Sequence, residues 1–459
     1  MPSEEFDIVI LGAGSGGYAC ALRAAQLGQR VALVEKDKLG GTCLHWGCIP
    51  TKALLHTAEV ADSVRDGARY GVSASLEGID MAAVHSYKDG VVGRLHKGLQ
   101  GLVKAAEAVT YVEGEGRLTS ASTVTVGDRE LTGRHVVLAT GSYARTLPGI
   151  DIGGRIMTSE QALQVDSVPE RIIVLGGGVI GVEFASVFRS FGSEVTVVEA
   201  LDRLVAAEDP AVSKALERGF RKRKITVRTG AKVASASQDD SGVRVELEGG
   251  DVLEADLLLV AVGRGPRTQD LGYEEVGVTL DRGWVPTDER LRTNVEGVRA
   301  VGDLVPGPQL AHRGFAHGIF VAEDIAGLEP APVDDALVPK VTYCDPEIAT
   351  VGLTEEQARE RHGDGVEVYE YNLGGNGKSQ ILGTSGFVKL VRSAPDGPVV
   401  GVHMVGARMG EQVGEAQLIV GWEALPDDVA QFVHAHPTQN EALGEAHLAL
   451  AGKPLHAHA

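Results

Sequence analysis

A short glycine pattern, GxGxxG, occurs twice in this chain of 459 residues. Each copy follows an apolar run typical of a buried parallel strand and precedes a helix-like stretch that ends at a glycine. A second apolar run then ends in a glutamate, at the same distance from the first glycine in both copies. These residues are Gly12, Gly14, Gly17 and Glu35 in the first copy, and Gly176, Gly178, Gly181 and Glu199 in the second. Strand, glycine turn, helix, strand and acid in this order predict an α/β protein with two Rossmann-like units.

Each glycine of such a unit has its own role if the unit binds a dinucleotide. The first allows a tight turn, the second lets the backbone approach a pyrophosphate at the helix N-terminus, and the third lets the helix pack on the strand. The glutamate would accept a hydrogen bond from a ribose hydroxyl, and Glu199 would repel a 2′-phosphate, so the second unit favours NAD over NADP. Arg203 is close enough in sequence to leave NADP open. Because no single cofactor requires two such units, two dinucleotides are expected.

Two of the four cysteines lie close together in the segment GTCLHWGCIPTK. In a regular helix, Cα atoms spaced like those of Cys43 and Cys48 would be about 8–9 Å apart, which is too far for a disulfide. Gly47 relaxes the backbone, so the two sulfurs could pair if the helix is interrupted between them. Lys52 and the helix N-terminus would then favour a thiolate at Cys48. A bridge bent into a helix start would be reducible, which favours a redox role over a structural disulfide or two buried thiols.

The charge and composition of the chain exclude several classes of protein. Lys and Arg total 43 and Asp and Glu total 63, which gives a net charge of −20 at pH 7 and argues against nucleic acid and anionic membranes as partners. The apolar runs are too short to cross a bilayer and no secretory signal is visible, so we expect a cytoplasmic protein. Thiols in that compartment stay reduced, so a disulfide there is expected to be catalytic. Cys20 and Cys344 lack paired neighbours and are expected to be inert.

Polar residues at three further strand ends suit ligand binding. One apolar run ends in Thr140 and Gly141, another in Gly302 and Asp303, and the second glycine unit closes with Gly263. Asp303 is placed to bind a polyol hydroxyl, although an aspartate in this position commonly forms a turn or caps a helix.

Changes of pattern divide the chain into four segments. Pro148 and Gly149 mark a crossing between domains, and after Val338 the pattern changes to β-rich alternation followed by helices. The expected segments are a first nucleotide-binding part at 1–148, the second unit at 149–266, a return to the first domain at 267–335, and a C-terminal α+β domain at 336–459. Within the first segment we expect a long packing helix at Ser86–Glu107, with Leu95, Leu99, Leu102 and Val103 on one side.

The C-terminal segment contains a second candidate site, HAHPTQNE. His436 is followed by a proline that fixes the chain, and Glu441 could orient its imidazole as a carboxylate orients a general base. A lone histidine is more commonly a satisfied structural residue. His434 and His436 could suggest a metal site, but no cysteine or third ligand accompanies them, so no metal is expected.

Together these motifs resemble those of the pyridine nucleotide–disulfide oxidoreductases, class I. The cysteine segment, both glycine units and the HPTQNE stretch occur in the family's order and cover nearly the whole chain. Within the family, the chain is most similar to members that oxidise dihydrolipoamide. It departs at His45-Trp46, where many relatives have Asn-Val, and at Gln439-Asn440, where many have Leu-Ser. The first departure could alter how a substrate approaches.

The resemblance implies FAD on the first unit, NAD on the second, and a homodimer. It implies that His436, held by Glu441, serves the cysteines of the other subunit, taking a proton from a dithiol whose thiolate attacks Cys43. Cys48 would then leave as a thiolate against the flavin, and Lys52 would pair with a glutamate of the second glycine helix, Glu183. The implied partners are lipoyl domains and the acyltransferase core of 2-oxoacid dehydrogenase complexes, or a lipoylated H protein.

Other activities remain open on the sequence. The runner-up is an NAD(P)H-dependent reductase of another small disulfide or of a quinone, and a redox-sensing flavoprotein without turnover is a third reading. The intact set of Cys43, Cys48, His436 and Glu441 argues against the third reading. A mercuric reductase or a large thioredoxin reductase would require a further C-terminal cysteine pair, whereas the last cysteine here is Cys344.

Overall fold

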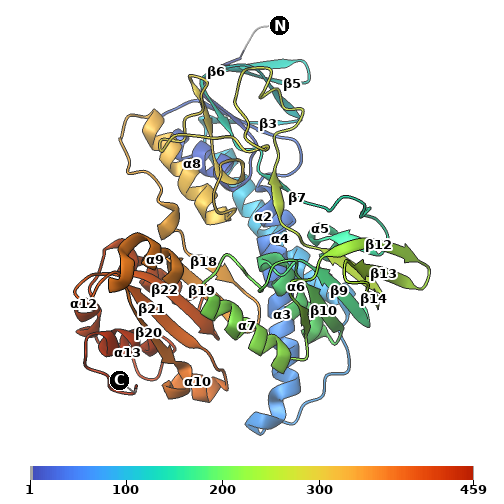
Figure 1. Cartoon of the computed structure of the whole chain (residues 1–459). Coiled ribbons are helices and arrows are strands. Elements are labelled where there is room, and N and C mark those ends of the chain that lie inside the picture. The colour runs from blue at the N-terminus through green and yellow to red at the C-terminus, as the bar shows by residue number, and fades with distance from the viewer. Residues whose placement is uncertain (1–3, 458–459) are drawn as a thin grey trace.

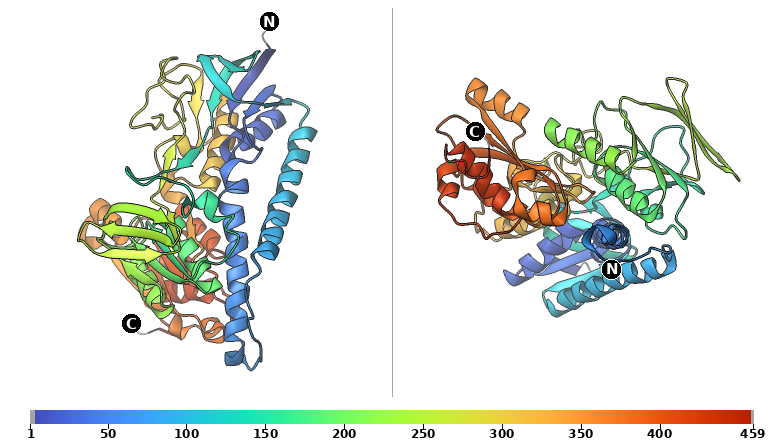
Figure 2. Two further views of the ribbon diagram at one scale, coloured as in Figure 1. Left: turned by 90° about the vertical axis from the view of Figure 1, so that its right-hand side faces the viewer. Right: turned by 90° about the horizontal axis from the view of Figure 1, so that it is seen from below.

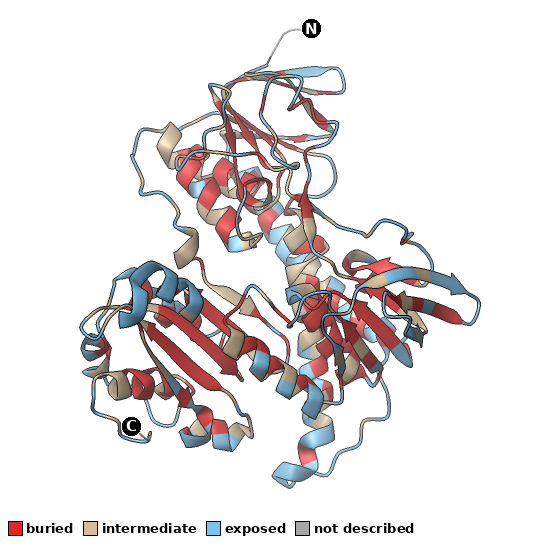
Figure 3. Ribbon diagram, viewed as in Figure 1, coloured by how far each residue is buried: buried red, intermediate tan, exposed pale blue. Residues whose placement is uncertain are grey.

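The computed structural model describes residues 4–457, which form three lobes around a long central helix (Figure 1). The first lobe, at the top of the view, contains the N-terminal glycine unit. The second lobe, at the right, contains the second glycine unit, and the C-terminal lobe lies at the lower left. Buried residues concentrate in the sheets and on the inner faces of the helices (Figure 3). The exact boundaries of the four expected segments stay a prediction.

The first lobe is built on a sheet with the strand order β3-β2-β1-β6-β5-β4, and β17 pairs with β6 on the path back from the second lobe. Strands β1, β2, β3, β6 and β17 pair in parallel, and the apolar run of β1 is buried between its neighbours. Helix α1 (Ser15–Gln26) packs against α8 (Ala311–Ile325). The strands are β1 Glu4–Leu11, β2 Val31–Glu35, β3 Val109–Glu113, β4 Gly116–Ser120, β5 Thr123–Val126, β6 Arg129–Leu138 and β17 Val298–Ala300.

Four helical segments connect β2 to β3. They are α2 Gly41–His45, α3 Cys48–Asp66, the 3-10 turn Gly67–Tyr70 and α4 Met81–Ala105. Helix α3 descends from the first lobe to the second, and α4 runs beside it (Figure 2).

The long packing helix is therefore present but begins earlier than expected, because the side chain of Asp80 caps it by accepting from the backbone N–H of Ala83. Leu95, Leu99, Leu102 and Val103 lie on one side of this helix as expected, but only Leu99 and Val103 are buried, whereas Leu95 and Leu102 are 47% and 60% exposed. Both lie on the same face of α4 as its buried residues, but in the described chain this part of the face is left largely exposed.

The second lobe repeats the first in its parallel sheet, with the order β11-β10-β9-β15-β8. Strands β9 and β10 flank the second glycine turn and α6 (Val179–Phe191), as β1 and β2 flank the first turn and α1. A small antiparallel sheet, β12-β13-β14, and the pair β7–β16 complete this region. Its other elements are β7 Ser142–Ala144, β8 Ile156–Thr158, α5 Ser159–Ala162, β9 Arg171–Leu175, β10 Glu194–Val198, α7 Pro210–Lys222, β11 Thr226–Arg228, β12 Val233–Asp239, β13 Gly242–Leu247, β14 Val252–Ala255, β15 Leu257–Val260 and β16 Arg264–Pro266.

The C-terminal lobe contains an antiparallel sheet in the order β18-β19-β22-β21-β20, with helices packed around it. Two parallel-sheet units and a separate C-terminal α+β lobe confirm the expected fold class. The elements are β18 Lys340–Thr342, β19 Glu347–Gly352, α9 Glu355–His362, β20 Glu367–Asn372, α10 Gly377–Leu382, β21 Phe387–Arg392, β22 Val399–Gly406, α11 Val413–Gly421, α12 Pro426–Ala430 and α13 Glu441–Leu450.

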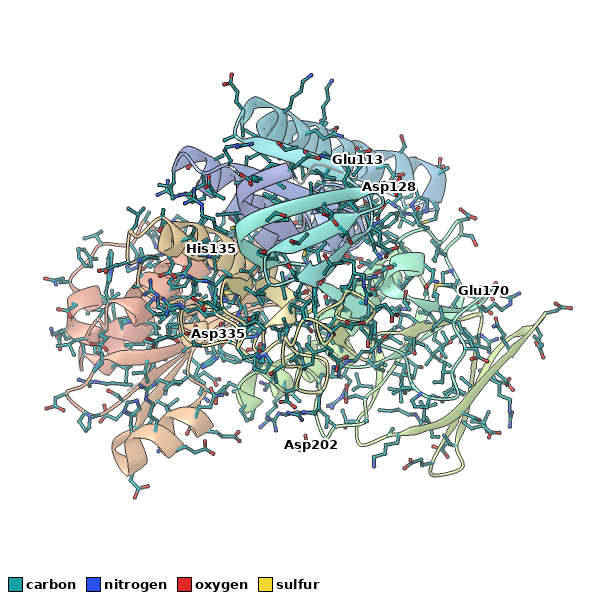
Figure 4. The ribbon with its side chains drawn as sticks, turned by 90° about the horizontal axis from the view of Figure 1, so that it is seen from above. Glu113, Asp128, His135, Glu170, Asp202 and Asp335 are labelled. Carbon is teal, nitrogen blue, oxygen red and sulfur yellow. The ribbon has the colours of Figure 1, made fainter. Side chains whose placement is uncertain are left out.

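Acidic side chains are spread over the outside of the molecule, in keeping with its negative charge. Seen from above in Figure 4, the labelled Glu113, Asp128, Glu170 and Asp202 come from separate parts of the chain and are all exposed. Within the described residues, none of the helices combines the length and apolar character needed to cross a membrane.

Candidate functional site

One continuous cavity of about 2450 Å³ joins both glycine loops and the cysteine segment. It brings together nearly all the residues that the sequence predicts to bind cofactors. From the first lobe it is lined by Gly12, Gly14, Glu35, Cys43, Cys48, Lys52, Thr140, Gly141, Gly302 and Asp303, and from the second by Gly176, Gly178, Glu183, Glu199 and Gly263.

The glycine loops of the two units have almost the same packing. A Cβ added to Gly12 would lie 2.4 Å from the carbonyl oxygen of Ala139, and one added to Gly176 would lie 2.3 Å from that of Ala261. A Cβ added to the third glycine of either unit, Gly17 or Gly181, would lie 1.9 Å from the carbonyl oxygen of the first glycine of the same unit. These positions require glycine because helix and strand approach closely, which explains why Gly17 and Gly181 pack inside rather than line the cavity.

The second glycine of each loop faces open space instead. A Cβ on Gly178 would meet nothing within 4 Å, and one on Gly14 would meet only the Cα of Gly41 at 4.0 Å. The space beside these residues lies at the N-termini of α1 and α6, where backbone N–H groups favour phosphate. The loops therefore fit the pyrophosphates of two dinucleotides.

The glutamates at the ends of β2 and β10 brace these loops. Glu35 accepts from the backbone N–H of Ala13 at 2.7 Å, and Glu199 accepts from that of Gly177 at 2.6 Å. A carboxylate has more lone pairs than these bonds use, so both remain able to accept from a ribose hydroxyl. Arg203, the nearby basic residue that keeps NADP as an alternative, donates to the carbonyl oxygen of Ala206 at 3.1 Å.

The cysteine helix is interrupted as the sequence predicts. Helix α2 ends at His45 and α3 begins at Cys48, and the Gly47 between them has φ −143° and ψ −110°. A Cβ on Gly47 would lie 3.1 Å from the carbonyl oxygen of Thr42, so glycine makes the break easy. The break brings Cys43 and Cys48 together as free thiols that are hydrogen-bonded to each other.

The two thiols have opposite electrostatic environments. The hydrogen bond from Cys43 is the largest influence on Cys48 and lowers its pKa, and the charge of Lys52 acts in the same direction against burial and Glu183. Donating that hydrogen bond, together with burial, raises the pKa of Cys43. Of the two sulfurs, Cys48 is therefore the one whose thiolate form is favoured. The other two thiols, Cys20 and Cys344, are buried and burial raises their pKa, which agrees with inert roles.

Lys52 is fixed by an ion pair with the second lobe. Its Nζ donates to both carboxylate oxygens of Glu183, at 2.9 and 2.8 Å, and the Glu183 side chain is only 3% exposed. Burial opposes the positive charge, but the charge of Glu183 and the hydrogen bonds to it outweigh burial and raise the pKa of Lys52. The ammonium beside Cys48 is thus permanently charged near neutral pH.

Asp303 lies in a short polar chain that sequence reasoning missed. It accepts from the hydroxyl of Ser142 at 2.5 Å, and Ser142 in turn accepts from the Nε of Arg264 at 2.7 Å. Ser142 directly follows Gly141, and Arg264 follows Gly263, so both neighbours of predicted residues could have been found by their position at strand ends. Asp303 and Arg264 line the cavity, so this chain presents charge to a ligand.

The His436 and Glu441 pair is formed in the C-terminal lobe. His436 Nδ1 lies 2.7 Å from Glu441 Oε1, and the backbone N–H of Thr438 donates to Glu441 Oε2 at 2.8 Å. The His436 side chain is 73% exposed and is not among the residues that line the cavity, so a single chain does not bring it to the cysteines. His434 instead pairs with Glu415 at 2.9 Å. In the part of the chain that the structure describes, no cluster of three or more potential ligands could hold a metal ion.

His45 and Trp46 lie between the cysteines, where many relatives have Asn-Val, and their surroundings differ. His45 is buried, its Nε2 lies 2.9 Å from the carbonyl oxygen of Leu39, and its ring packs edge-on against His96. His45 and Trp46 both line the cavity, but Trp46 is only half-buried, and its ring lies 4.9 Å from the ammonium of Lys38. Trp46 is therefore the better placed of the two to influence the approach of a substrate.

Several solved structures and curated proteins are similar to this chain along nearly its whole length. Dihydrolipoyl dehydrogenase of Bacillus subtilis (strain 168) is 40% identical over 99% of this chain and 100% of its own length, and leghemoglobin reductase of Vigna unguiculata is 39% identical over 99% and 89%. The structure of LpdA from Mycobacterium tuberculosis matches with a TM-score of 0.89 at 26% identity, covering 97% of this chain and 99% of its own. The Cu(II) complex of the HOCl-induced flavoprotein disulfide reductase RclA from Escherichia coli matches with a TM-score of 0.88 at 27% identity, covering 98% and 100%.

Two family models account for most of the sequence. The model for pyridine nucleotide-disulphide oxidoreductases matches residues 6–318, and the model for their dimerisation domain matches residues 338–447. The first match spans both glycine loops and the cysteine pair, and the second spans the C-terminal lobe. The chain therefore belongs to the pyridine nucleotide-disulphide oxidoreductases, class I, a family of FAD-dependent enzymes that use a pyridine nucleotide and carry a dimerisation domain.

Proposed function

We propose that the protein oxidises protein-bound dihydrolipoamide to lipoamide with NAD⁺ as the electron acceptor, as a dihydrolipoyl dehydrogenase. The observation that carries this proposal is the cysteine pair, with its lowered thiol pKa at Cys48, placed in one cavity between two dinucleotide loops. Curated relatives named dihydrolipoyl dehydrogenase, about 40% identical over nearly the whole chain, support it.

The two sulfurs have different roles in this proposal. In the oxidised enzyme Cys43 and Cys48 form a disulfide, and a substrate thiolate attacks Cys43 and displaces Cys48 as a thiolate that Lys52 stabilises. The second substrate sulfur then attacks the first, which closes the lipoamide ring and releases Cys43, now reduced. FAD bound to the first lobe would take this electron pair from sulfur and pass it as hydride to NAD⁺ on the second lobe.

His436 supplies the base for the first step. Its exposed ring takes a proton from the substrate dithiol while Glu441 orients it through Nδ1. Because this ring does not line the cavity of its own chain, we propose that His436 of one subunit serves the cysteines of the other, through the dimerisation domain. Co-expression of Cys48→Ser and His436→Ala subunits tests this, since mixed dimers should regain activity. If mixed dimers form but stay inactive, each chain works alone.

We expect Glu199 to favour NAD, because its carboxylate, which accepts from the backbone N–H of Gly177 in the second loop, would repel a 2′-phosphate there. The expected partners are lipoyl domains and the acyltransferase core of 2-oxoacid dehydrogenase complexes, or a lipoylated H protein. A second candidate, an NAD(P)H-dependent reductase of another disulfide or of a quinone, is favoured by the likeness to the flavoprotein disulfide reductase RclA.

One experiment separates the two candidates. Purified protein would be reduced anaerobically with dihydrolipoamide and then mixed with NAD⁺, while the formation of NADH is followed by absorbance. Stoichiometric NADH formation supports the proposed function. Reduction by NADH without any reduction by dihydrolipoamide would support the alternative.

A further inference from the structure

We propose that Tyr343, which belongs to the dimerisation domain, is a positioning residue of the redox site and holds the ion pair of Lys52 and Glu183 so that the lysine charge acts on Cys48. This inference rests on the proposed function, in which Cys48 is the sulfur that leaves as a thiolate. Tyr343 is not part of any motif that the sequence singled out, and its position becomes informative only in the folded chain.

Tyr343 reaches the ion pair in two ways. Its backbone N–H donates to Glu183 Oε1 at 2.9 Å, and its ring centroid lies 4.8 Å from Lys52 Nζ. That separation is within the range of a cation–π interaction. Both contacts cross from the C-terminal lobe to the redox site, because Tyr343 lies directly after β18, Lys52 lies on α3 and Glu183 lies on α6.

The loop that carries Tyr343 is seated on one face of α6. Two residues after Tyr343, the backbone N–H of Asp345 donates to the hydroxyl of Ser186 at 3.1 Å. Glu183 and Ser186 are three residues apart and therefore neighbours on the helix surface. The bond to Glu183 thus fixes the backbone of Tyr343 itself, with its ring beside Lys52, and the bond to Ser186 is a second, separate anchor of the same loop.

These contacts have a defined electrostatic consequence. Lys52 favours the Cys48 thiolate and Glu183 disfavours it, so the thiolate depends on the balance between the two charges. The backbone N–H of Tyr343 offsets part of the Glu183 charge, and its ring excludes water from one side of the ammonium, whose side chain is 31% exposed. Both effects leave Lys52 the stronger influence on the sulfur.

Other charged groups face the same residues. Cys48 also faces Cys43 and Arg264, and Tyr343 also faces Glu347 and Glu411. Burial above all, helped by these carboxylates and opposed by Lys52, raises the pKa of Tyr343. The tyrosine therefore stays neutral, and it acts through its ring face and its backbone rather than through a charge of its own.

The test measures the thiol directly, in the flavin-loaded protein. In a Cys43→Ser background, the rate at which iodoacetamide alkylates Cys48 is followed against pH by mass spectrometry, and the thiolate pKa is read from the profile. Tyr343→Leu, or Tyr343→Met if the leucine variant does not fold, should raise this pKa by about half a pH unit, the usual worth of an exposed cation–π contact. Tyr343→Phe keeps the ring and should leave the pKa unchanged.

Ser186→Ala is the matched control. It removes the neighbouring hydrogen bond of the same loop on the same helix without touching Lys52, so the pKa of Cys48 should not move. Two results would overturn the proposal: an unchanged pKa in the variants without a ring, or an equal rise in Ser186→Ala, which would mean that only the seating of the loop matters. Dihydrolipoamide oxidation by the unmodified protein is measured separately, so failure of the proposed function and failure of the Tyr343 inference are told apart.

Discussion

The two glycine units have the same loop but different neighbours. In both, the first and third glycines meet backbone atoms at nearly equal distances, and the second faces the cavity. Around the first unit the packing is tight, because a Cβ on Gly318 of α8 would lie 2.3 Å from the carbonyl oxygen of Gly16 in α1. In the second unit, Val179 at the start of α6 is 41% exposed and lines the cavity. We infer that the first unit keeps its dinucleotide resident, whereas the second admits one that exchanges.

We infer from this comparison that the glycine spacing identifies dinucleotide binding, whereas neighbouring elements decide which kind of dinucleotide is bound. Helix α8 packs against α1 after the first loop, and this loop shares the cavity with the cysteine segment, as we expect for a flavin that exchanges electrons with sulfur. The second unit instead contributes Glu183, from helix α6 directly after its loop, to the ion pair with Lys52. Lys52 therefore links the two units.

The largest expected effect distinguishes reduction of the enzyme by dihydrolipoamide from its reduction by NADH. His436→Ala should slow reduction by dihydrolipoamide by about 10²–10⁴-fold, the usual worth of a positioned base. Reduction by NADH at the second unit should remain unchanged, because His436 lies in the other lobe. Stopped-flow absorbance of each half-reaction measures both. Equal slowing of the two half-reactions would contradict a role limited to the dithiol.

Replacing the third glycine of one unit by alanine should weaken dinucleotide binding in that unit and leave the other unit unaffected. Since the added Cβ would overlap a backbone carbonyl oxygen in both, each substitution should cost about 1–3 kcal/mol, or roughly 5- to 150-fold in binding. Gly17→Ala should be purified with little flavin, whereas Gly181→Ala should keep its flavin and bind NAD⁺ more weakly. The flavin content per chain and an NAD⁺ titration provide the readout. Loss of flavin from both variants would mean that the units do not have separate ligands.

Removing Lys52, which links the two units, should change the pH at which the Cys48 thiolate forms. Lys52→Met withdraws a positive charge that lowers the pKa of Cys48, so the thiolate should form about one pH unit higher. The pH dependence of the long-wavelength absorbance in the two-electron-reduced enzyme measures this shift. An unchanged or lower midpoint would show that Lys52 does not act on the sulfur.

The smallest expected effect concerns the choice of nucleotide. Glu199→Arg replaces the repulsion of a 2′-phosphate by attraction and should shift the ratio of kcat/KM values toward NADP by about tenfold. Steady-state assays with both nucleotides measure the ratio. If the unmodified protein already used NADP as efficiently as NAD, the role given to Glu199 would be wrong.

Most of the fold and much of the candidate site could be predicted from the sequence, because their signals are local. The glycine loops, the strand before each loop and the break between Cys43 and Cys48 depend on neighbouring residues. The exposure of Leu95 could not be predicted, because helical periodicity does not show whether another element covers that part of the helix. Tyr343 was missed for the same physical reason: its contact with Glu183 joins residues 160 positions apart. In the proposed mechanism the place where His436 acts depends on a second subunit, which the pattern of one chain cannot show.

The assignment of the sulfurs is tested most directly by the visible absorption spectra of the two serine variants in their oxidised, flavin-loaded forms, without any reductant. Because Lys52 favours the Cys48 thiolate and a serine hydroxyl at position 43 can also donate a hydrogen bond to it, Cys43→Ser should leave Cys48 as a free thiolate. This variant should therefore show a long-wavelength charge-transfer band with FAD. Cys48→Ser should show none, and both variants should fail to oxidise dihydrolipoamide. A band in Cys48→Ser and none in Cys43→Ser would contradict the account and reverse the two sulfurs.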